Sequence, residues 1–403
     1  MNELLLTIED FKRNLFEYKE KYILLDLRDG EQYMYGHIPN AINCRADILN
    51  MALDNIQSGD IDKVLSNVKL EKNKKIIIYS DSNKDSLILG KKLYELGYDV
   101  KVIKDGYVSW ILYKMEQEVK DDESDKNAEV ELSIRKKFHK KIFSKFAKAI
   151  KTYELLKPND KVMVCISGGK DSMLMAKLFQ ELKRHDRFPF ELEFVVMDPG
   201  YNNANRNVIE KNAKLLDIPI KIFETPIFDT VVDIEKSPCY LCARMRRGYL
   251  YSYAQKLGCN KIALGHHYDD VIETILMGML YGAQIQTMMP KLHSTNFEGL
   301  ELIRPLYLVR EEDIIKWREY NELYFLQCAC KFTDETSSLM GNSLKESSSK
   351  RKEVKNLIKE LKKVNPYVEG NIFKSVENVN LSTIIAYKTN GHKYSFLDSY
   401  DEK

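Results

Sequence analysis

The sequence predicts an α/β protein with two parallel-sheet domains and a C-terminal extension that is mainly helical. Short β-rich apolar segments alternate with helical segments over residues 1–115 and again over 134–335, and a charged linker, 116–133, separates the two stretches. Such alternation is typical of parallel βα units. In the second stretch a glycine loop, Ser167–Ser172, stands between a strand and a helix, where α/β folds bind ligands. Residues 336–403 are rich in lysine and form the extension.

The first domain is expected to begin with apolar strands that polar residues bound on both sides. A segment with helical spacing lies between the second and third strands, and Gly97 can cap it. The strands are Tyr22–Leu27, Lys75–Tyr79 and Val100–Ile103, and the helix is Ser86–Leu96. Residues 117–127 then lack large apolar side chains, which is typical of a linker.

A basic amphipathic helix, 134–156, is expected to lead into the second domain. That domain should contain three further strands and three helices after the glycine loop. The strands are Leu192–Met197, Ile220–Phe223 and Lys261–Leu264, and the helices are Asn205–Leu216, Cys242–Leu257 and Asp269–Tyr281. In the extension 345–363 is the clearest helix, and the last forty residues contain no motif that we can interpret.

Composition favours a cytoplasmic protein. No segment has the roughly 18 consecutive apolar residues of a membrane helix, and the first residues lack the order of a signal peptide. Seven cysteines in a chain of 403 residues without such a signal favour metal or redox chemistry over a disulfide framework. The basic segments 135–141 and 345–363 suit a polyanion such as RNA, although solvated helix faces explain either one alone equally well.

The glycine loop has the features of a phosphate cradle. Gly168 and Gly169 allow a tight turn and a close approach to an anion, and the free N–H groups at the following helix start can hold that anion. The Walker pattern cannot be laid over this loop. An ordinary glycine-rich turn is the alternative.

Two pairs of cysteines can supply metal ligands. Cys239 and Cys242 lie one helical turn apart, and Cys328 and Cys330 can add a third thiolate if the chain folds back. Such a set suits one metal or cluster, or a redox dithiol. A cluster with three thiolates leaves one iron open for sulfur. Buried thiols without a ligand are the alternative.

The segment Gly265–Asp270 follows a strand and precedes a helix, which places it at a carboxyl end of the sheet. Carboxylates there suit Mg²⁺, and the alternative for the two aspartates is helix capping. For His266 and His267 a structural hydrogen bond is the favoured role. Arginines and tyrosines that suit phosphates and unpaired bases follow Cys242, although some of these tyrosines must belong to the core; they are Arg244, Arg246, Arg247, Tyr249, Tyr251 and Tyr253.

The sequence Ser-Gly-Gly-Lys-Asp-Ser resembles the loop of the PP-loop ATP pyrophosphatases, and a longer resemblance covers residues from about 132 to 335. Five motifs stand in the order typical of the TtcA family, the tRNA 2-thiocytidine synthetases. They are Ser167–Ser172, Pro238–Cys242, Gly265–Asp270, Met289–Leu292 and Arg304–Leu306.

The resemblance implies an ATP-dependent tRNA sulfurtransferase with Mg²⁺ and a [4Fe–4S] cluster. Cys239 and Cys242 would be ligands, and Cys328 best matches the third; Cys330 competes for that place because it lies two residues further on instead of three. The implied catalytic residues are Asp171, Asp269 and Arg246. The implied nucleotide-binding residues are Ser167, Gly168, Gly169, Lys170, Asp171, Ser172, Asp198, Gly265 and His266.

In the implied reaction, ATP adenylates O2 of a cytidine in the anticodon loop, and sulfur from the cluster then displaces AMP. The implied partners are tRNA and a sulfur donor, either sulfide or a persulfide carrier such as a cysteine desulfurase, and the family tendency is a homodimer. Two alternatives stay open: a PP-loop enzyme that thiolates another tRNA base or a small metabolite, and a sulfur-relay scaffold without catalysis. A ligase of the lysidine type is a weaker variant, because it needs no cysteine pair.

The first domain resembles rhodanese, a sulfurtransferase fold, over residues 5 to 115. The resemblance is carried by Leu25–Arg28, Gly36–Asn43 and Asp105–Trp110. Ser80 stands where the family has its nucleophilic cysteine, and a hydroxyl cannot store sulfane sulfur. We therefore expect an inactive domain that docks a partner or presents the substrate, unless Cys44 takes over. One sequence does not tell whether Ser80 is natural or introduced.

Overall fold

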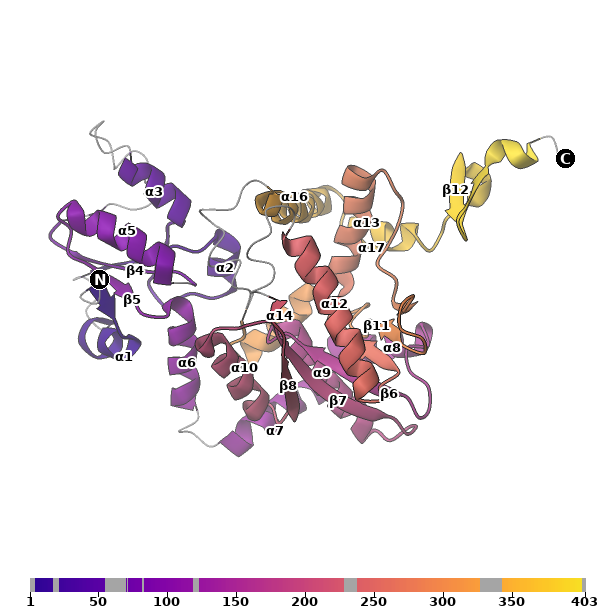
Figure 1. Ribbon diagram of the computed structural model, residues 1–403, viewed down its shortest axis with the longest axis horizontal. Helices are drawn as coiled ribbons and strands as arrows, with labels where there is room; N and C mark the ends of the chain where they lie inside the picture. Colours follow the sequence, from indigo (N-terminus) through magenta and orange to yellow (C-terminus); the bar gives the residue numbers. More distant parts are fainter. Residues whose placement is uncertain are drawn as a thin grey trace. The chain divides into compact units, whose positions relative to one another are not determined.

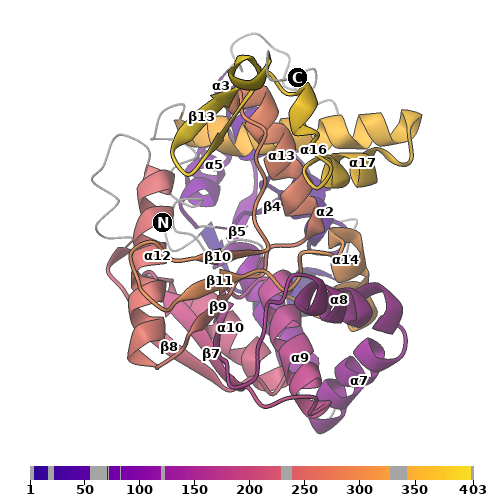
Figure 2. The same cartoon turned by 90° about the vertical axis from the view of Figure 1, so that its right-hand side faces the viewer.

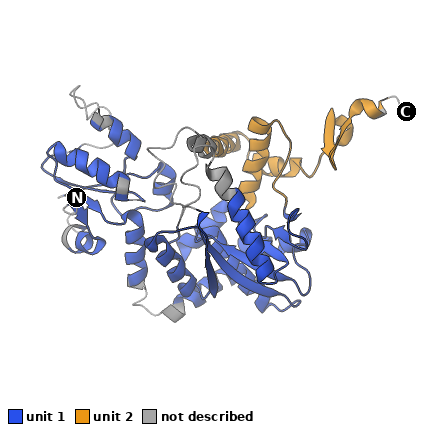
Figure 3. Cartoon of the chain, in the orientation of Figure 1, with its two compact units in different colours: residues 1–266, 290–344 blue, residues 267–289, 345–403 orange. Residues whose placement is uncertain are grey.

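The computed structural model describes residues 4–16, 22–54, 70, 72–81, 83–118, 123–227, 238–326 and 343–400. The chain divides into two compact units (Figure 3). Unit 1 comprises residues 1–266 and 290–344 and holds the five-stranded and the six-stranded sheet, and unit 2 comprises residues 267–289 and 345–403. The predicted α/β class is confirmed. Among the helices of the described residues, none combines the length and hydropathy needed to cross a membrane.

The N-terminal sheet has five parallel strands in the order β1-β5-β4-β2-β3 (Figure 1). Its strands are β1 Leu5–Leu6, β2 Tyr22–Asp26, β3 Ile42–Asn43, β4 Lys75–Tyr79 and β5 Val100–Ile103, and its helices are α1 Ile8–Phe11, α2 Gly30–Tyr35, α3 Ala46–Asp54, α5 Asn83–Glu95 and α6 Gly106–Glu118. Ile76, Ile77 and Ile78 are fully buried. Consecutive buried apolar residues are typical of a strand that is covered on both faces, so the predicted β4 is a central strand.

The second sheet has six strands in the order β10-β11-β9-β6-β7-β8. All neighbours are parallel except β10 and β11, an antiparallel pair at one edge that the sequence did not predict. The strands are β6 Lys161–Ile166, β7 Glu191–Asp198, β8 Ile220–Glu224, β9 Lys261–Ala263, β10 Lys291–His293 and β11 Glu301–Ile303. The helices are α7 Glu123–Arg135, α8 Ser144–Thr152, α9 Lys170–Arg184, α10 Asn203–Leu215, α12 Pro238–Lys256 and α14 Glu311–Tyr320.

Helices cover both faces of this sheet, with α12 on one side of the strands and α9 on the other (Figure 2). On the α12 side, Tyr251 and Ala254 pack into a buried cluster with Met163 and Ile262 of the strands. Met173, Leu174 and the other apolar residues along α9 are also buried. Because both faces are covered, ligands can reach the sheet only at its edges and strand ends.

The segment 116–133, expected to be a charged linker, is helical over much of its length: α6 runs to Glu118 and α7 occupies Glu123–Arg135. A buried lysine of α9 explains the difference: Lys177 Nζ donates to Asn127 Oδ1 at 2.9 Å and to Glu131 Oε1 at 3.0 Å. A polar segment without large apolar residues is thus held by hydrogen bonds to a neighbouring helix. The expected basic helix over 134–156 is also interrupted, by a π-helix at His139–Phe143 that leads into α8.

Unit 2 is built around three helices, α13 Tyr268–Gly282, α16 Ser343–Val364 and α17 Val368–Ser375. The ring of Tyr268 stacks on that of Phe373 with 4.4 Å between centroids. Arg351 donates to Asp270 Oδ1 and to Glu273 Oε2, both at 2.7 Å. The predicted helices at 269–281 and 345–363 are therefore present and packed within one unit.

A β hairpin follows these helices in a region where the sequence predicted no element. Its strands are β12 Ala386–Thr389 and β13 His392–Ser395. Asn390 and Gly391 connect them, both with positive φ, at 51° and 80°. Asn-Gly is the preferred dipeptide of the two-residue hairpin turn. The extension of residues 336–403 is thus helical first and partly β-structured afterwards.

Candidate functional site

Three adjacent strands of the second sheet end at the predicted site. The loop Ser167–Gly169 follows β6, Gly265 and His266 follow β9, and Asp198 is the last residue of β7. Strand β6 pairs with β9 on one side and with β7 on the other, all parallel. The carboxyl ends of parallel strands meet at one edge of a sheet. The structure therefore brings together three segments that are far apart in the sequence.

The turn after β6 requires glycine at position 168 for two reasons. Its φ is +84°, in the left-handed region that disfavours side chains. A Cβ at this position would also lie 2.6 Å from Cγ1 of the buried Ile209. The backbone at Gly168 and helix α10 are therefore packed too closely for a side chain at position 168.

Helix α9 begins directly after this turn and presents its N-terminus to the edge of the sheet. Its N-cap is Gly169, which offers no side chain to bond the first N–H groups. Ser172 fixes the turn instead: its Oγ accepts from the Ser167 N–H at 3.2 Å and donates to the Gly169 carbonyl at 3.0 Å. N–H groups that no cap side chain occupies and a positive helix dipole make such a helix start suitable for a phosphate.

Lys170 supplies a buried positive charge at the same place. Its ammonium lies 3.1 Å from Asp171 Oδ2 and 3.4 Å from Glu311 Oε1, and its side chain is 10% exposed. Burial alone would lower the pKa of Lys170, but the charges of Asp171 and Glu311 raise the pKa above the ordinary value. Lys170 is therefore charged at all physiological pH values and can balance the charge of a phosphate.

The segment after β9 lies against the start of α9. A Cβ at Gly265 would be 3.3 Å from the Ser172 backbone nitrogen, so glycine permits this close approach. His266 follows and is half-buried. The predicted nucleotide-binding residue Gly265 is thus next to the glycine loop, and His266 is the next residue along the chain.

Asp198 has a different arrangement from the other predicted site residues. Its Oδ1 accepts from the backbone N–H groups of Gly200 and Tyr201 at 2.8 and 2.7 Å, and its Oδ2 lies 3.4 Å from Arg206 Nη1. The carboxylate therefore shapes the loop after β7. A role of Asp198 in nucleotide binding would therefore be indirect, through the position of this loop.

Asp269 belongs to unit 2 and lies in the first turn of α13. His267 caps the helix: its ring nitrogen accepts from the Asp270 N–H, and Asp270 accepts in return from the His267 N–H. The expectation that one aspartate of this pair caps the helix is confirmed for Asp270. His267 has the structural role that the sequence favoured.

The predicted cluster ligands lie at or beyond the limits of the described residues. Cys239 and Cys242 fall in the first two turns of α12, three positions apart, but the side chains of residues 238–243 are not described. Cys328 and Cys330 lie outside the described residues. Within the parts of the chain that are described, no group of three acidic, histidine or cysteine side chains could hold a metal.

The cysteines whose side chains are described are unsuited to bind metal or attack a substrate. Cys44, Cys165 and Cys259 are free thiols. Burial raises the pKa of Cys165 to about 12 and the pKa values of Cys44 and Cys259 to about 11. These thiols are therefore protonated at neutral pH, and a protonated thiol is a poor nucleophile and ligand.

The arginines and tyrosines of α12 divide between surface and core. Arg244 and Arg247 are exposed, and the predicted catalytic residue Arg246 is half-buried. Tyr251 stacks on Phe297 and Tyr253 stacks on Phe223, so these two tyrosines are core residues, as expected for part of the set. The exposed Tyr249 is the member of the set that remains available for stacking on a base.

In the N-terminal domain, Ser80 directly follows β4 and is 8% exposed. Its hydroxyl lies 2.6 Å from that of Ser86, and its carbonyl accepts from the Tyr107 N–H at 3.0 Å. Gly106, with a φ of +52°, passes so close that a Cβ would lie 1.8 Å from that carbonyl oxygen. The serine therefore sits in a closely packed loop and has a hydroxyl partner.

Two residues near Lys170 were not predicted. Glu311 is the first residue of α14, and the acidic run Glu311–Asp313 after Arg310 was the available signal for a helix start. Tyr35 lies in the N-terminal domain, 135 positions before Lys170 in the sequence, and its ring centroid is 5.8 Å from the Lys170 ammonium. Nothing in the sequence around Tyr35 indicates this contact.

Two family models match the chain. A PP-loop domain matches residues 137–336, and a rhodanese-like domain matches residues 7–112. A tRNA-cytidine(32) 2-sulfurtransferase of Coxiella burnetii is 35% identical over 259 residues, which are 63% of this chain and 95% of the relative. One of Neisseria meningitidis is 38% identical over 195 residues, which are 48% of this chain and 61% of the relative. The chain therefore spans about three fifths of the Neisseria protein and nearly all of the Coxiella protein.

Among solved structures, the U34-tRNA thiolase NcsA of Methanococcus maripaludis with its [4Fe–4S] cluster is 25% identical. The match covers 58% of this chain and 76% of that one, with a TM-score of 0.45.

Proposed function

Because this chain belongs to the family of the tRNA-cytidine(32) 2-sulfurtransferases, we propose that it is an ATP-dependent enzyme that replaces oxygen by sulfur in a tRNA base. The observation that carries the proposal is the glycine loop at the edge of the second sheet. It combines a turn with no room for a side chain, an N-terminus without a capping side chain and a buried lysine.

ATP fits this loop through its phosphates. The N–H groups at the start of α9 and the Lys170 ammonium would hold the β- and γ-phosphates, and the helix dipole favours their charge. When the base oxygen attacks the α-phosphorus, the bond to pyrophosphate breaks and negative charge grows on the leaving group. Fixed donors at that place lower the barrier because they need no rearrangement.

The proposed reaction consists of two group transfers, and in each, one bond forms as another breaks. In the first, cytidine O2 forms a bond to the α-phosphorus and pyrophosphate leaves. In the second, a sulfur nucleophile forms a bond to C2, the C2–O2 bond breaks, and AMP leaves with the former base oxygen. With sulfide as the proposed donor, neither step involves oxidation or reduction. With a persulfide carrier as the donor, a thiol must also reduce the S–S bond and end in a disulfide as the outer sulfur is transferred.

Mg²⁺ is proposed to arrive with the nucleotide. It usually keeps several waters and binds one or two carboxylates together with substrate phosphates. The Asp171 side chain, 29% exposed at the start of α9, is the proposed ligand in unit 1. A role of Asp269 in binding Mg²⁺ stays a prediction from the sequence.

The cysteines of α12 fit an iron–sulfur cluster by their spacing. Positions three apart on a helix share one face, so Cys239 and Cys242 can contribute to one site. We propose Cys328 as the third ligand, with Cys330 as the competing choice. A cluster held by three cysteines supplies one iron with an open position for sulfur.

The tRNA is proposed to contact α12 near these cysteines. Arg244 and Arg247 are exposed there, and Arg246 is half-buried beside them. Guanidinium groups suit phosphate oxygens because they donate two parallel hydrogen bonds. Binding should therefore weaken steeply with salt concentration, as is typical when cations neutralise a polyanion.

The N-terminal domain is proposed to be inactive as a sulfurtransferase. Ser80 cannot form a persulfide, and the buried thiol of Cys44, whose pKa burial raises to about 11, cannot replace it. The domain would then help to form the nucleotide site or bind a partner, without carrying sulfur.

The test is an assay with full-length protein loaded anaerobically with its cluster, tRNA, ATP and sulfide. We expect 2-thiocytidine in the digested tRNA, detected by nucleoside mass spectrometry, and none with Asp171→Ala. Thiolation of a base other than cytidine would support the proposed reaction but show that its substrate is a different nucleoside. A scaffold without catalysis would form no thiolated nucleoside in this assay, and its function in cells would be unchanged by Asp171→Ala.

A further inference from the structure

Helix α2 of the rhodanese-like domain ends beside the glycine loop of the PP-loop domain, and both belong to unit 1. Its last residue is Tyr35. Arg318 Nη1 donates to the Tyr35 carbonyl at 2.7 Å, and the Arg318 guanidinium carbon lies 4.3 Å from the centroid of the Tyr35 ring. Helix α14, which carries Arg318, therefore holds the end of α2 by its backbone and by its ring.

The same ring faces the lysine of the loop. Lys170 Nζ is 5.8 Å from the Tyr35 ring centroid, within the range of a cation–π contact. Burial raises the pKa of Tyr35, so the phenol is neutral and the ring offers a π face without a competing negative charge. Two cations from the PP-loop domain thus contact one ring from the other domain.

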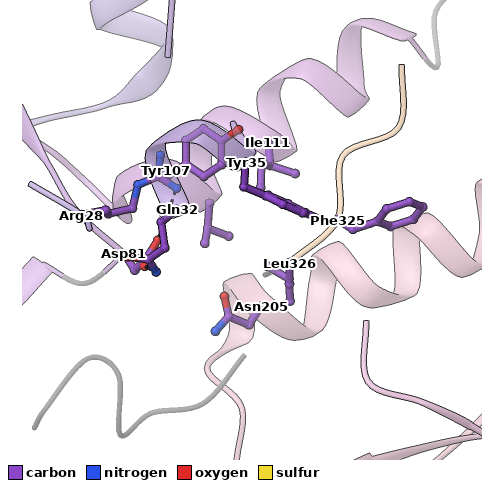
Figure 4. Close-up of a pocket in the computed structure, with 10 residues that line it drawn as sticks. Arg28, Gln32, Tyr35, Asp81, Tyr107, Ile111, Asn205, Phe325 and Leu326 are labelled. Carbon is purple, nitrogen blue, oxygen red and sulfur yellow. Dashed lines mark hydrogen bonds and ion pairs between the residues drawn. The ribbon is translucent and has the colours of Figure 1, made fainter. Parts of the chain in front are cut away.

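A small cavity of about 20 Å³ separates the two domains at this place (Figure 4). Arg28, Tyr35 and Ile111 line it from the rhodanese-like domain, and Asn205, Phe325 and Leu326 line it from the PP-loop domain. That volume holds about one water molecule. The Tyr35 side chain therefore has little free volume beside it.

Leu326 links this packing to the loop itself. Its Cδ1 would lie 3.7 Å from a Cβ at Gly168, and its carbonyl oxygen would lie 3.4 Å from a Cβ at Gly169. Phe325 and Leu326 are 2% and 4% exposed. Leu326 therefore both lines the cavity and packs against the phosphate cradle. A second tie between the domains is the ion pair of Lys211 with Glu116, at 2.6 Å.

The Lys170 ammonium has carboxylate partners, Asp171 and Glu311, and the Tyr35 ring limits its remaining space. A lysine has a long flexible stem, so its position is set by what surrounds it. We propose that Tyr35 is a positioning residue for the nucleotide site: the rhodanese-like domain holds Lys170 in place for the phosphates of ATP. This inference rests on the proposed use of ATP and gives the domain a role that needs no nucleophilic cysteine.

The test compares full-length variants in ATP binding by calorimetry and in pyrophosphate release with tRNA. Tyr35→Ala should weaken ATP binding about tenfold, the size of one desolvated cation–π contact. The KM for ATP should rise with it, while kcat stays within about twofold because the reacting atoms are untouched. Tyr35→Phe keeps the ring and should behave like wild type. Tyr94→Ala, at a 62% exposed tyrosine of the same domain, is the matched control and should have no effect.

A thermodynamic cycle with Lys170→Met separates positioning from a general loss of structure. In that background Tyr35→Ala should cost no further affinity, because the group that it positions is absent. If Tyr35→Ala fails to fold, Arg318→Gln provides the test, since it removes the guanidinium that holds the ring and should weaken ATP binding in the same direction.

Unchanged ATP affinity in Tyr35→Ala or in a folded Arg318→Gln, or equal losses with and without Lys170, would overturn the inference and leave the proposed function intact. A loss in Tyr35→Phe as large as in Tyr35→Ala would also overturn it. A wild-type protein that binds no ATP would instead contradict the proposed function itself.

Discussion

Replacement of Gly168 by alanine tests the phosphate cradle at its most constrained atom. The change adds one methyl group where φ is +84°, and that methyl carbon would lie 2.6 Å from Ile209 Cγ1 and 3.0 Å from Ile209 Cδ1. Ile209 is 1% exposed and cannot turn away into solvent. Either the turn or helix α10 must therefore move.

The expected cost has two parts. A left-handed conformation costs an alanine about 1–2 kcal/mol, and overpacking of a core costs about 1–3 kcal/mol. The free energy of unfolding should therefore fall by about 2–5 kcal/mol. A shift of the turn by about 1 Å should also reduce the rate of ATP-dependent adenylation by about 100-fold, because the reacting groups lose their alignment.

Denaturant unfolding measures the stability, and pyrophosphate release measures the adenylation step. Gly258→Ala is the matched control, since its φ is +67° but nothing lies within 4 Å of its added carbon. The control should show only the conformational cost of about 1–2 kcal/mol and full activity. In an Ile209→Ala background, Gly168→Ala should cost only the conformational part of the stability, because the Ile209 atoms that it would contact are absent. A Gly168→Ala protein as stable and as active as the control would refute the described packing of the loop.

Two further predictions concern buried charges. Burial raises the pKa of Asp81 from 3.8 to about 6, so the folded state favours the protonated carboxyl and loses stability as pH rises through this range. In denaturant titrations, Asp81→Asn should therefore become more stable relative to wild type as pH rises from about 4 to about 7. A difference in stability that does not change with pH would contradict this prediction. Lys177→Met removes the hydrogen bonds to Asn127 and Glu131, so it should lower the free energy of unfolding by about 1–3 kcal/mol and increase amide hydrogen exchange in α7. Unchanged exchange in Glu123–Arg135 would show that the lysine does not hold this helix.

Hydrophobic patterning was sufficient to predict most strands and the long helices. Lys75–Tyr79 and Lys261–Leu264 are short apolar runs between polar segments, and each became a strand within one residue of its predicted bounds. The loop Ser167–Ser172 was predictable because its glycines and its place between strand and helix are local properties. Local properties do not depend on how the rest of the chain folds.

The failures have two physical causes. Residues 123–133 look like a linker by composition, but they are helical, and Asn127 and Glu131 accept hydrogen bonds from Lys177, which is far away in the sequence. The hairpin at 386–395 had a local signal that was overlooked, the Asn390-Gly391 turn between β-rich residues.

The site was predictable where motifs lie at strand ends, since Gly168 and Gly265 follow two of three adjacent strands and Asp198 ends the third. Tyr35 and Glu311 were not predictable as partners of Lys170. They reach it from other elements, and the docking of two domains has no local signature. The placement of the four cysteines predicted as cluster ligands remains a prediction.

The central claim is that this loop uses ATP to activate a base oxygen for replacement by sulfur. The most direct measurement is the stoichiometry of products when cluster-loaded protein, tRNA, ATP and sulfide react. The account predicts one AMP and one pyrophosphate for each thiolated nucleoside, and no product of either kind with Asp171→Ala. ADP and phosphate in place of AMP and pyrophosphate, or thiolation that proceeds without ATP, would contradict it.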